Sequence, residues 1–400
     1  MQGKATILII DQGAAFGGSL VVIANLVRCL DQAQFRAVVV GEMDKAIMQS
    51  HIRGSAKVYL AKHNFNYVHW RKVTSILLKI RVKLLRKAGL YLLSIIRRIV
   101  NSLYIMKLAM IILRERVDLV HINNGTDNFE ANLVSFLLAR KRIIHVHGIG
   151  RVSYLERLFL KVVPKVIVIS EFVRSEMLKA GIPDEKMIVL PNPVLPEVVS
   201  ADARARVREK YGIGEDDRIF GVFGRVVQWK GQMEFLRAAA LVLAQTEGTK
   251  ALIVGDISDG SDEYLLALQQ FVVQNGIQDR VIFTGYASNV AELYVAMDVV
   301  VHTSIEPEPF GLVITEAMAY GIPVVASTLG APPEIIHDKY DGFLVHPANT
   351  TELAAVITTL LRDDALRKTI GMRGQQGVLT TYDAKAYAAS VEKLYRQVLA

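Results

Sequence analysis

The sequence predicts an α/β protein of two domains, each a parallel β-sheet with helices on both faces. Short apolar runs alternate with amphipathic helical patterns along most of the chain, which is typical of such sheets. A chain of 400 residues is long enough for two domains that each bury a core. Three prolines within residues 191–196 interrupt the pattern, so we place the domain boundary near residue 193.

Each expected strand is a short apolar run of the kind found in buried parallel sheets. In the first domain the expected strands are 5–10, 36–40, 118–122, 142–147 and 165–169. In the second domain they are 218–223, 250–254, 281–284, 299–302, 323–326 and 342–345. Ligands of open parallel sheets bind at the carboxyl ends of the strands, so we expect the active site in the cleft between the domains.

The composition is that of a globular protein without disulfides. Hydrophobic residues make up 52% and charged residues 22% of the chain. Cys29 is the one cysteine; it lies in an apolar helical pattern and is expected in the core, in a reducing compartment. The apolar run at 5–10 is too short for a signal peptide, and no run of 18 uncharged apolar residues predicts a transmembrane helix.

Residues 66–115 interrupt the strand–helix rhythm and are expected to be helical. Residues 62–116 carry 13 Lys and Arg against one acid, a net charge of +12, whereas the whole chain carries +8. At about 100° per residue, one helix face collects basic residues and the other collects apolar ones. The basic face holds Lys72, Lys79, Lys83, Arg86 and Arg97, and the apolar face holds Leu77, Ile80, Leu84, Tyr91 and Leu92.

This basic amphipathic pattern predicts that residues 70–113 bind an anionic membrane surface or a lipid-linked substrate. A helical hairpin with a solvated basic face, or an oligomer contact, is the structural alternative. Nucleic acid is not expected as a partner, because the charge is not interleaved with exposed aromatic residues and no known reader motif occurs.

The most informative motif is a pair of glutamates, Glu308 and Glu316, separated by seven residues. Glu308 is expected in a loop just before a helix that carries Glu316. A carboxylate there can accept hydrogen bonds from sugar hydroxyls, and the helix N-terminus offers N–H groups and positive potential to a phosphate. The second carboxylate, two turns further on, can reach a ribose diol.

A second motif lies at residues 221–231, where a strand ends in glycine. Gly224 lets the backbone approach a ligand, and Arg225 and Lys230 follow, five residues apart. These two cations can neutralise a diphosphate without a metal ion.

Together these motifs closely resemble the E-x7-E motif and the Gly-Arg…Lys-Gly pattern of retaining GT-B glycosyltransferases, in particular glycosyltransferase family 4. The resemblance covers about residues 1–60 and 117–400. It implies two Rossmann-like domains that face each other across a cleft. The basic helical segment lies outside the resemblance and is expected to be an insertion in the N-terminal domain.

Two further positions match the family pattern. Gly17 and Gly18, after the first strand, match a loop that faces the donor phosphates and the acceptor. His147 matches a histidine that contacts the hydroxyls of the donor sugar. We expect His145 to lie on the opposite face of its strand and to be structural, so that the two histidines do not form a metal site. Gly255 stands where the family more commonly has Gly-x-Gly.

The resemblance implies which residues form the site. The expected catalytic residues are Glu308, His147, Arg225 and Lys230. The expected donor-binding residues are Gly17, Gly18, Gly224, Arg225, Lys230, Pro309, Phe310, Gly311, Leu312 and Glu316. No Asp-x-Asp motif occurs, so a metal-dependent GT-A design is disfavoured and neither a divalent metal nor another cofactor is expected.

The implied reaction moves a sugar, of the hexosyl type, from a nucleoside diphosphate sugar to an acceptor hydroxyl with retention of configuration. Arg225, Lys230 and the helix N-terminus would stabilise the leaving diphosphate. Glu308 as a covalent nucleophile and a same-face attack by the acceptor both remain open. A GT-B sugar-nucleotide epimerase and a non-catalytic, membrane-associated sugar-nucleotide-binding protein are the alternative functions.

The expected organisation follows from these assignments. Residues 1–193 form the acceptor-side domain, with the helical insertion at about 66–115, and 194–382 form the donor-binding domain. Residues 383–400 form a helix that packs back toward the N-terminal domain. With its basic segment on the membrane, the enzyme is expected in the cytoplasm, peripheral on the inner face, acting on a lipid-linked or polysaccharide acceptor.

Overall fold

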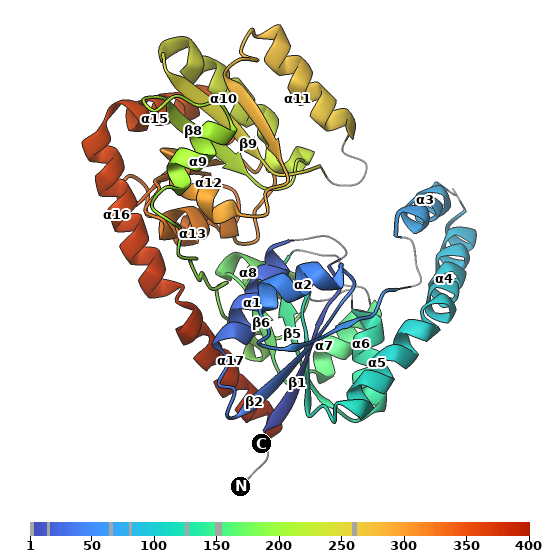
Figure 1. The fold of residues 1–400 in the computed structure, drawn as a ribbon. Coiled ribbons are helices and arrows are strands. Elements are labelled where there is room, and N and C mark those ends of the chain that lie inside the picture. Colours follow the sequence, from blue (N-terminus) through green and yellow to red (C-terminus); the bar gives the residue numbers. More distant parts are fainter. Residues whose placement is uncertain are drawn as a thin grey trace. The chain divides into compact units, whose positions relative to one another are not determined.

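The computed structural model describes residues 4–13, 17–63, 67–79, 82–124, 128–148, 154–257 and 262–400. Its internal contacts divide the chain into two compact units, each with its own parallel sheet (Figure 1). Unit 1 comprises Met1–Ile169, Val173–Leu190 and Lys385–Ala400, and unit 2 comprises Ser170–Phe172 and Pro191–Ala384.

Unit 1 is built on a seven-stranded parallel sheet in the order β3-β2-β1-β4-β5-β6-β7. Its strands are β1 (Ala5–Asp11), β2 (Phe35–Gly41), β3 (Lys57–Leu60), β4 (Leu119–Ile122), β5 (Lys141–Val146), β6 (Val166–Val168) and β7 (Met187–Val189). The central strands are almost entirely buried, because helices cover both faces of the sheet. The sequence pattern misses β3 and β7, which are short edge strands with only part of their length buried.

The helices that connect these strands are amphipathic segments with one face on the sheet. They are α1 (Gly18–Cys29), α2 (Lys45–Ile52), α6 (Phe129–Leu137), α7 (Tyr154–Val162) and α8 (Glu171–Lys179). Cys29 is half-buried in the last turn of α1, so the expectation that it lies in the core is wrong. The buried face of α1 ends with Leu26 and Val27, and the chain turns away after them.

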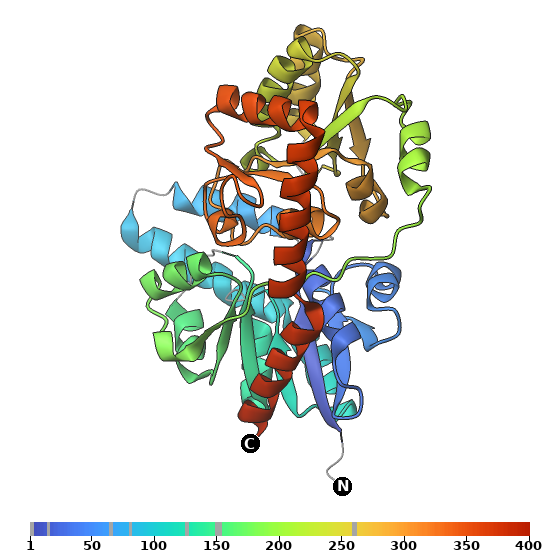
Figure 2. The same cartoon turned by 90° about the vertical axis from the view of Figure 1, so that its left-hand side faces the viewer.

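The last helix, α17 (Ala384–Leu399), packs on the sheet of unit 1 from residue 385 onward (Figure 2). The fully buried ring of Tyr395 makes an edge contact with Phe35 of β2, and its hydroxyl lies 2.7 Å from Nδ1 of His121 on β4. The backbone N–H of Asp31 donates to Glu392 at 2.8 Å. The C-terminal end of the chain therefore completes the core of unit 1.

Three helices follow β3, namely α3 (Tyr67–Leu78), α4 (Lys83–Val100) and α5 (Ser102–Arg114). Four buried side chains attach α5 to the unit: Tyr104, Leu108, Ile111 and Ile112. Of the residues assigned to the amphipathic pattern, Ile80 lies outside the described residues, as do the side chains of Lys72, Lys83 and Arg97. Within the described ranges, no helix has the length and apolar character needed to cross a membrane.

Unit 2 is built on a six-stranded parallel sheet in the order β10-β9-β8-β11-β12-β13. Its strands are β8 (Arg218–Phe223), β9 (Thr249–Val254), β10 (Val281–Gly285), β11 (Val299–His302), β12 (Val324–Ser327) and β13 (Phe343–Val345). All six are predicted by the sequence, with ends that differ by at most one residue.

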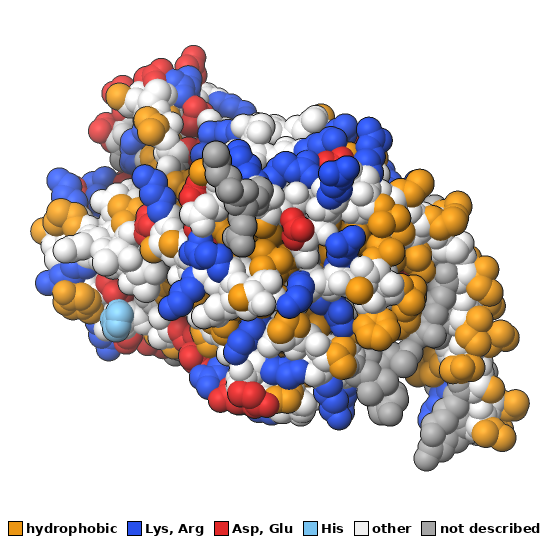
Figure 3. Space-filling model, turned by 90° about the horizontal axis from the view of Figure 1, so that it is seen from below, with side chains coloured by type: hydrophobic (Ala, Val, Ile, Leu, Met, Phe, Trp, Pro, Cys, Tyr) orange, Lys and Arg blue, Asp and Glu red, His pale blue; other side chains and the backbone are white. Residues whose placement is uncertain are grey.

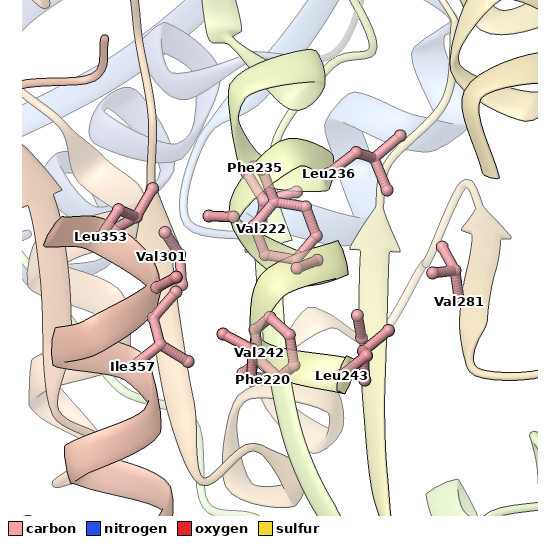
Figure 4. Close-up of a cluster of buried hydrophobic side chains, with 14 of the residues drawn as sticks. Phe220, Val222, Phe235, Leu236, Val242, Leu243, Val281, Val301, Leu353 and Ile357 are labelled. Carbon is pink, nitrogen blue, oxygen red and sulfur yellow. The ribbon is translucent and has the colours of Figure 1, made fainter. Parts of the chain in front are cut away.

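The helices of unit 2 alternate with these strands. They are α9 (Ala203–Lys210), α10 (Gln232–Gln245), α11 (Asp262–Gln274), α12 (Val290–Ala296), α13 (Leu312–Ala319), α14 (Pro332–Ile335), α15 (Thr350–Arg362) and α16 (Asp364–Thr381). Figure 4 shows one side of the core, where side chains of α10 and α15 pack onto β8 and β11. The labelled residues include Phe220, Val222, Phe235, Val242, Val301 and Ile357. This packing holds the carboxyl ends of β8 and β11, which carry the polar residues described next.

Candidate active site

In unit 2, Glu308 lies in the loop between β11 and α13, as the sequence predicts. Its backbone N–H donates to the carbonyl oxygen of Leu329 at 3.0 Å, and its own carbonyl oxygen accepts from Ala331 N–H at 2.9 Å. Gly330, between these partners, has φ +90°, and a Cβ there would overlap the backbone of Glu308. A glycine is therefore needed for the chain after β12 to clamp the loop.

The Glu308 carboxylate is buried and bound through one oxygen. Oε2 accepts a hydrogen bond from Lys230 Nζ at 2.6 Å and from Ser304 Oγ at 2.9 Å, and it lies 3.0 Å from His302 Nε2. The residue is 7% exposed. Oε1 accepts no hydrogen bond from any of the described residues, so this second oxygen remains available to a hydroxyl group.

Glu308 is held ionised. Burial alone would raise the pKa of its carboxyl group, but the Lys230 charge and the hydrogen bond from His302 outweigh burial and hold the pKa well below its usual range. The group is therefore a fixed negative charge with one oriented oxygen, and it is not a proton donor.

Lys230 is positioned by the turn that precedes α10. It ends the single-turn helix Gln228–Lys230, and its ammonium lies 4.1 Å from the ring centroid of Trp229. The next residue, Gly231, has φ +71°, and a Cβ at this position would overlap the carbonyl oxygen of Thr303. This close approach brings Lys230 to Glu308. Arg225, after Gly224 at the end of β8, is exposed.

His302 is a site residue that the sequence interpretation missed. It ends the buried strand β11, and its side chain touches both Glu308 Oε2 and Ser304 Oγ at 3.0 Å. The signal was present in the sequence, since a polar run follows three valines at the carboxyl end of a parallel strand. The sequence interpretation counted His302 as the last residue of the strand 299–302 and assigned its side chain no role.

Glu316 lies in the second turn of α13. Tyr294 Oη donates to its Oε2 at 2.9 Å, and the Tyr294 ring stacks on Phe223 with centroids 4.3 Å apart. Although the residue as a whole is half-buried, its carboxyl lies below the surface, and burial raises its pKa to about 7. Near neutral pH it exchanges readily between the acid and the carboxylate.

The remaining predicted residues of unit 2 surround the start of α13. Gly311 is the N-cap of α13 and Leu312 is its first residue, so the first N–H groups of the helix lie at this point. Phe310 is buried, and its ring makes an edge contact with Tyr382, with centroids 5.7 Å apart. Phe310 therefore anchors the loop, together with Pro309 before it.

In unit 1, polar groups gather at the carboxyl ends of β1, β4 and β5. Asp11 accepts hydrogen bonds from the side chains of Asn124 and Ser19, and burial raises the pKa of its carboxyl group. Gly17 is the N-cap of α1 and Gly18 its first residue, directly before Ser19. The sequence interpretation identified the glycines but not Asp11, although an acid immediately after a buried strand is a comparable signal.

His147 lies half-buried at the end of β5. Its Nε2 is 2.7 Å from Oδ1 of Asn123, so this nitrogen carries the proton and donates. The expectation that His145 lies on the opposite face is wrong, since the two rings are 3.9 Å apart. Residues two apart in a strand share a face, because side chains alternate with a period of two.

These two rings and that of His121 form a row of tilted ring contacts, which we call the histidine stack. His121 and His145 have ring centroids 5.4 Å apart, and both are almost fully buried. Burial lowers the pKa of His121 and of His147 to about 3 and lowers that of His145 well below its usual value. All three are neutral at physiological pH, so His147 can act only as a hydrogen-bonding group there.

A charged cluster around His63, by contrast, contacts α5. His63 pairs with Glu42 and lies 3.8 Å from Glu130, and its ring stacks on Tyr104 of α5 at 3.9 Å. Burial lowers the pKa of His63, but the hydrogen bonds to the two carboxylates outweigh it and raise the pKa to about 9. Within the described residues, no group of three His, Cys, Asp or Glu side chains is arranged to hold a metal ion.

The architecture is that of the GT-B fold, with two parallel Rossmann-like sheets. The chain resembles HepE of Anabaena, solved in complex with UDP-glucose, with a TM-score of 0.78 at 24% identity over 98% of this chain and 99% of that one. It also resembles a glycosyltransferase from Rickettsia africae, with a TM-score of 0.78 at 21% identity over 100% and 99%.

The family follows from two further matches. The model described as Glycosyltransferase Family 4 matches residues 16–198, and the model described as Glycosyl transferases group 1 matches residues 203–377. The chain belongs to the group 1 glycosyltransferases of family 4, whose enzymes retain the anomeric configuration of the transferred sugar.

Two curated relatives are informative by name. N-acetyl-alpha-D-glucosaminyl L-malate synthase of Bacillus anthracis is 32% identical over 48% of this chain and 49% of its own length. The capsular polysaccharide biosynthesis glycosyltransferase CapM of Staphylococcus aureus is 25% identical over 73% of this chain and 80% of its own. The match thus spans about half the length of the first of these relatives.

The histidine stack predicts that unit 1 loses stability in acid. Unfolded histidines take up protons near pH 6.5, whereas His121 and His147 resist protonation in the fold down to about pH 3. Below pH 6.5 the unfolded state therefore binds more protons, and the free energy of unfolding falls by about 1.4 kcal/mol per pH unit for each histidine. Urea denaturation at several pH values between about 7.5 and 5 measures this slope.

In the variant His121→Gln, the dependence of the free energy of unfolding on pH should be smaller by about 1.4 kcal/mol per pH unit, because one titrating histidine is removed. His346→Gln is the control, because His346 is an exposed histidine of unit 2 and its loss should leave the slope unchanged. Equal slopes in the wild type and in His121→Gln would contradict the prediction.

Proposed function

We propose that this protein is a nucleotide-sugar-dependent, retaining glycosyltransferase that moves a hexosyl group to an acceptor hydroxyl. The observation that carries the proposal is the convergence of Lys230, His302 and Ser304 on one oxygen of Glu308, in the loop directly before α13. It provides an oriented carboxylate for sugar hydroxyls beside a helix N-terminus suited to a phosphate.

In this proposal, unit 2 binds the donor. The exposed guanidinium of Arg225, the ammonium of Lys230 and the first N–H groups of α13 at Gly311 and Leu312 stabilise the diphosphate as it leaves. Fixed positive groups aimed at developing negative charge are usually a large catalytic contribution. Glu316, whose carboxyl group has a pKa that burial raises to about 7, accepts hydrogen bonds from the ribose diol.

Glu308 orients the sugar through Oε1, and Oε2 stays bound to its three partners. A carboxylate whose pKa lies well below its usual range and that already accepts strong hydrogen bonds is a poor nucleophile. This favours same-face attack by the acceptor over a covalent glycosyl–enzyme intermediate. The leaving phosphate then takes the proton from the acceptor hydroxyl.

Unit 1 is proposed to bind the acceptor and to contribute His147, which is neutral, donates through Nε2 to Asn123, and accepts a hydrogen bond from a hydroxyl of the donor sugar through its other ring nitrogen. We propose residues 1–193 and 194–382 as the acceptor-side and donor-binding domains, with the C-terminal helix returning to the first. The acceptor proposed is a polysaccharide or lipid-linked intermediate, and the name of CapM, a capsular polysaccharide biosynthesis glycosyltransferase, supports the polysaccharide.

The location proposed for this reaction is the cytoplasmic face of the membrane, with the protein bound peripherally. The +12 balance of residues 62–116 supports electrostatic attraction of residues 70–113 to anionic lipids. Each basic residue near such a surface contributes on the order of 1 kcal/mol.

The central test is release of nucleotide from a panel of UDP, GDP and ADP sugars, with and without candidate acceptors. With the accepted donor, Arg225→Ala and Lys230→Ala should each lower turnover by roughly 10²–10³-fold, the usual cost of losing one preorganised group that stabilises transition-state charge. Arg237→Ala is the control, because Arg237 is an exposed residue of α10 that pairs with Glu234. Wild-type turnover in both variants would remove the diphosphate assignment.

A second prediction concerns the pH dependence of donor binding. Hydrogen bonds from a ribose diol favour the carboxylate of Glu316, so binding should release a proton below about pH 7. The dissociation constant of the accepted donor should then rise by up to about tenfold per pH unit below 7. Isothermal titration across this range should show the effect in the wild type and not in Glu316→Gln. The same dependence in both proteins would argue against this role.

A third prediction concerns metal ions. Arg225 and Lys230 supply the positive charge that a divalent cation supplies in metal-dependent transferases, so turnover should persist in EDTA. Complete loss of activity that magnesium restores would contradict the metal-independent assignment.

A further inference from the structure

Helices α4 and α5 expose an unusual number of large apolar side chains. Ten such residues have between 41% and 77% of their surface exposed. We call them the α4–α5 ridge: Leu84, Leu85, Tyr91, Leu92, Ile96, Ile99, Leu103, Met106, Met110 and Leu113. In the space-filling view from below, orange apolar side chains gather along the right-hand edge, where these helices lie (Figure 3).

The ridge follows the helical repeat. From Leu92 to Leu113 its members are spaced three or four residues apart, so that they share one side of α4 and then one side of α5. The side chains that attach α5 to unit 1, such as Tyr104, Leu108 and Ile111, lie on the opposite side of that helix. Helix α5 is therefore apolar on two sides, and the core of unit 1 uses only one of them.

The charge around the ridge indicates what covers it. Lys79, which follows α3, and Lys107 and Arg114 on α5 are exposed, and residues 62–116 contain a single acid, Glu115. Glu115 is already paired with Arg36 and Lys57. A second copy of this chain would bring two strongly basic segments together, which costs energy. An anionic bilayer offers negative head groups and an apolar interior side by side.

We propose that the α4–α5 ridge inserts into the boundary between head groups and acyl chains of an anionic lipid bilayer. The helices lie in the plane of the surface, and their long basic side chains reach the head groups. This inference deepens the proposed peripheral location and rests on it, and it names the apolar side chains of α4 and α5 that enter the bilayer.

Insertion and electrostatic adsorption differ in their response to salt. The Debye length falls from about 10 Å at 0.1 M to about 3 Å at 1 M salt, so adsorption by charge alone is nearly abolished at the higher value. Burial of apolar side chains does not weaken in this way. The ridge therefore predicts a component of binding that persists at about 1 M salt.

The test is co-flotation of the full chain with vesicles of equal parts phosphatidylcholine and phosphatidylglycerol, at low and high salt. The ridge variant replaces Ile99, Leu103, Met106 and Met110 by Ser, all on the exposed side. Its partition coefficient at about 1 M salt should fall by on the order of 10²-fold or more, given the transfer energy of four large side chains. The charge variant, Lys79, Lys83, Arg86 and Lys87 to Gln, should lose binding mainly at low salt.

The matched control replaces four equally exposed apolar residues of unit 2 by Ser and should bind vesicles like the wild type. These residues are Leu241, Leu266, Val273 and Met372. Thermal melting checks that all variants fold. As a second readout, the variant Met106→Trp should show blue-shifted emission on vesicles and quenching by brominated acyl chains.

Unchanged flotation of the folded ridge variant at high salt, or Met106→Trp emission that vesicles do not alter, would overturn the proposal. The proposal would also be overturned if the wild type is a dimer that does not bind vesicles and the ridge variant is a monomer. The ridge would then be an interface between copies of the chain. Thermal shifts with the panel of UDP, GDP and ADP sugars are measured in parallel on the wild type and the ridge variant. Absence of a shift in the wild type with every sugar of the panel would contradict the proposed function and leave the vesicle result intact.

Discussion

The buried ion pair between Lys230 and Glu308 constrains much of unit 2. A carboxylate that is nearly excluded from water is stable only with partners, and removing one partner leaves an uncompensated charge. Two separate segments supply those partners, the turn that ends at Lys230 and the end of β11 with His302 and Ser304. Two glycines allow the close approaches: Gly231 against Thr303, and Gly330 against the Glu308 backbone. The loop before α13 is therefore rigid before any ligand arrives, which is the condition for orienting a reacting sugar.

Unit 1 shows how burial assigns different charges to the same residue type. His121, His145 and His147 are stacked where burial has no opposing carboxylate, and they are neutral. His63 is also largely buried, but its contacts with Glu42 and Glu130 keep it charged. The neutral histidine stack ends with His147 at the carboxyl end of β5, where a ligand can be held by hydrogen bonds alone. The charged His63 cluster contacts α5 through Tyr104.

Helix α5 has two apolar sides, of which one packs in the core of unit 1 and the other is exposed. One side of the helix is part of the core, and Tyr104 on that side stacks on His63. The other side continues the apolar ridge of α4. No helix of the described residues is suited to cross a membrane, so the second side of α5 is not part of a membrane span. In water this apolar side stays hydrated, which is energetically costly.

The sequence by itself determined where the strands of unit 2 lie, because apolar runs placed all six of them. The spacing of Glu308 and Glu316 likewise placed one carboxylate in a loop and the other on a helix. These features are local, since period and spacing are written along the chain. Only the tertiary structure decided that Lys230 binds Glu308, that His302 joins them, and that His121 of the neighbouring strand packs beside His145. Those contacts join residues far apart in the chain, or depend on which face of a strand is buried. The short edge strands β3 and β7 were missed for the same reason, because their pairing with a neighbouring strand, and not their own composition, makes them strands.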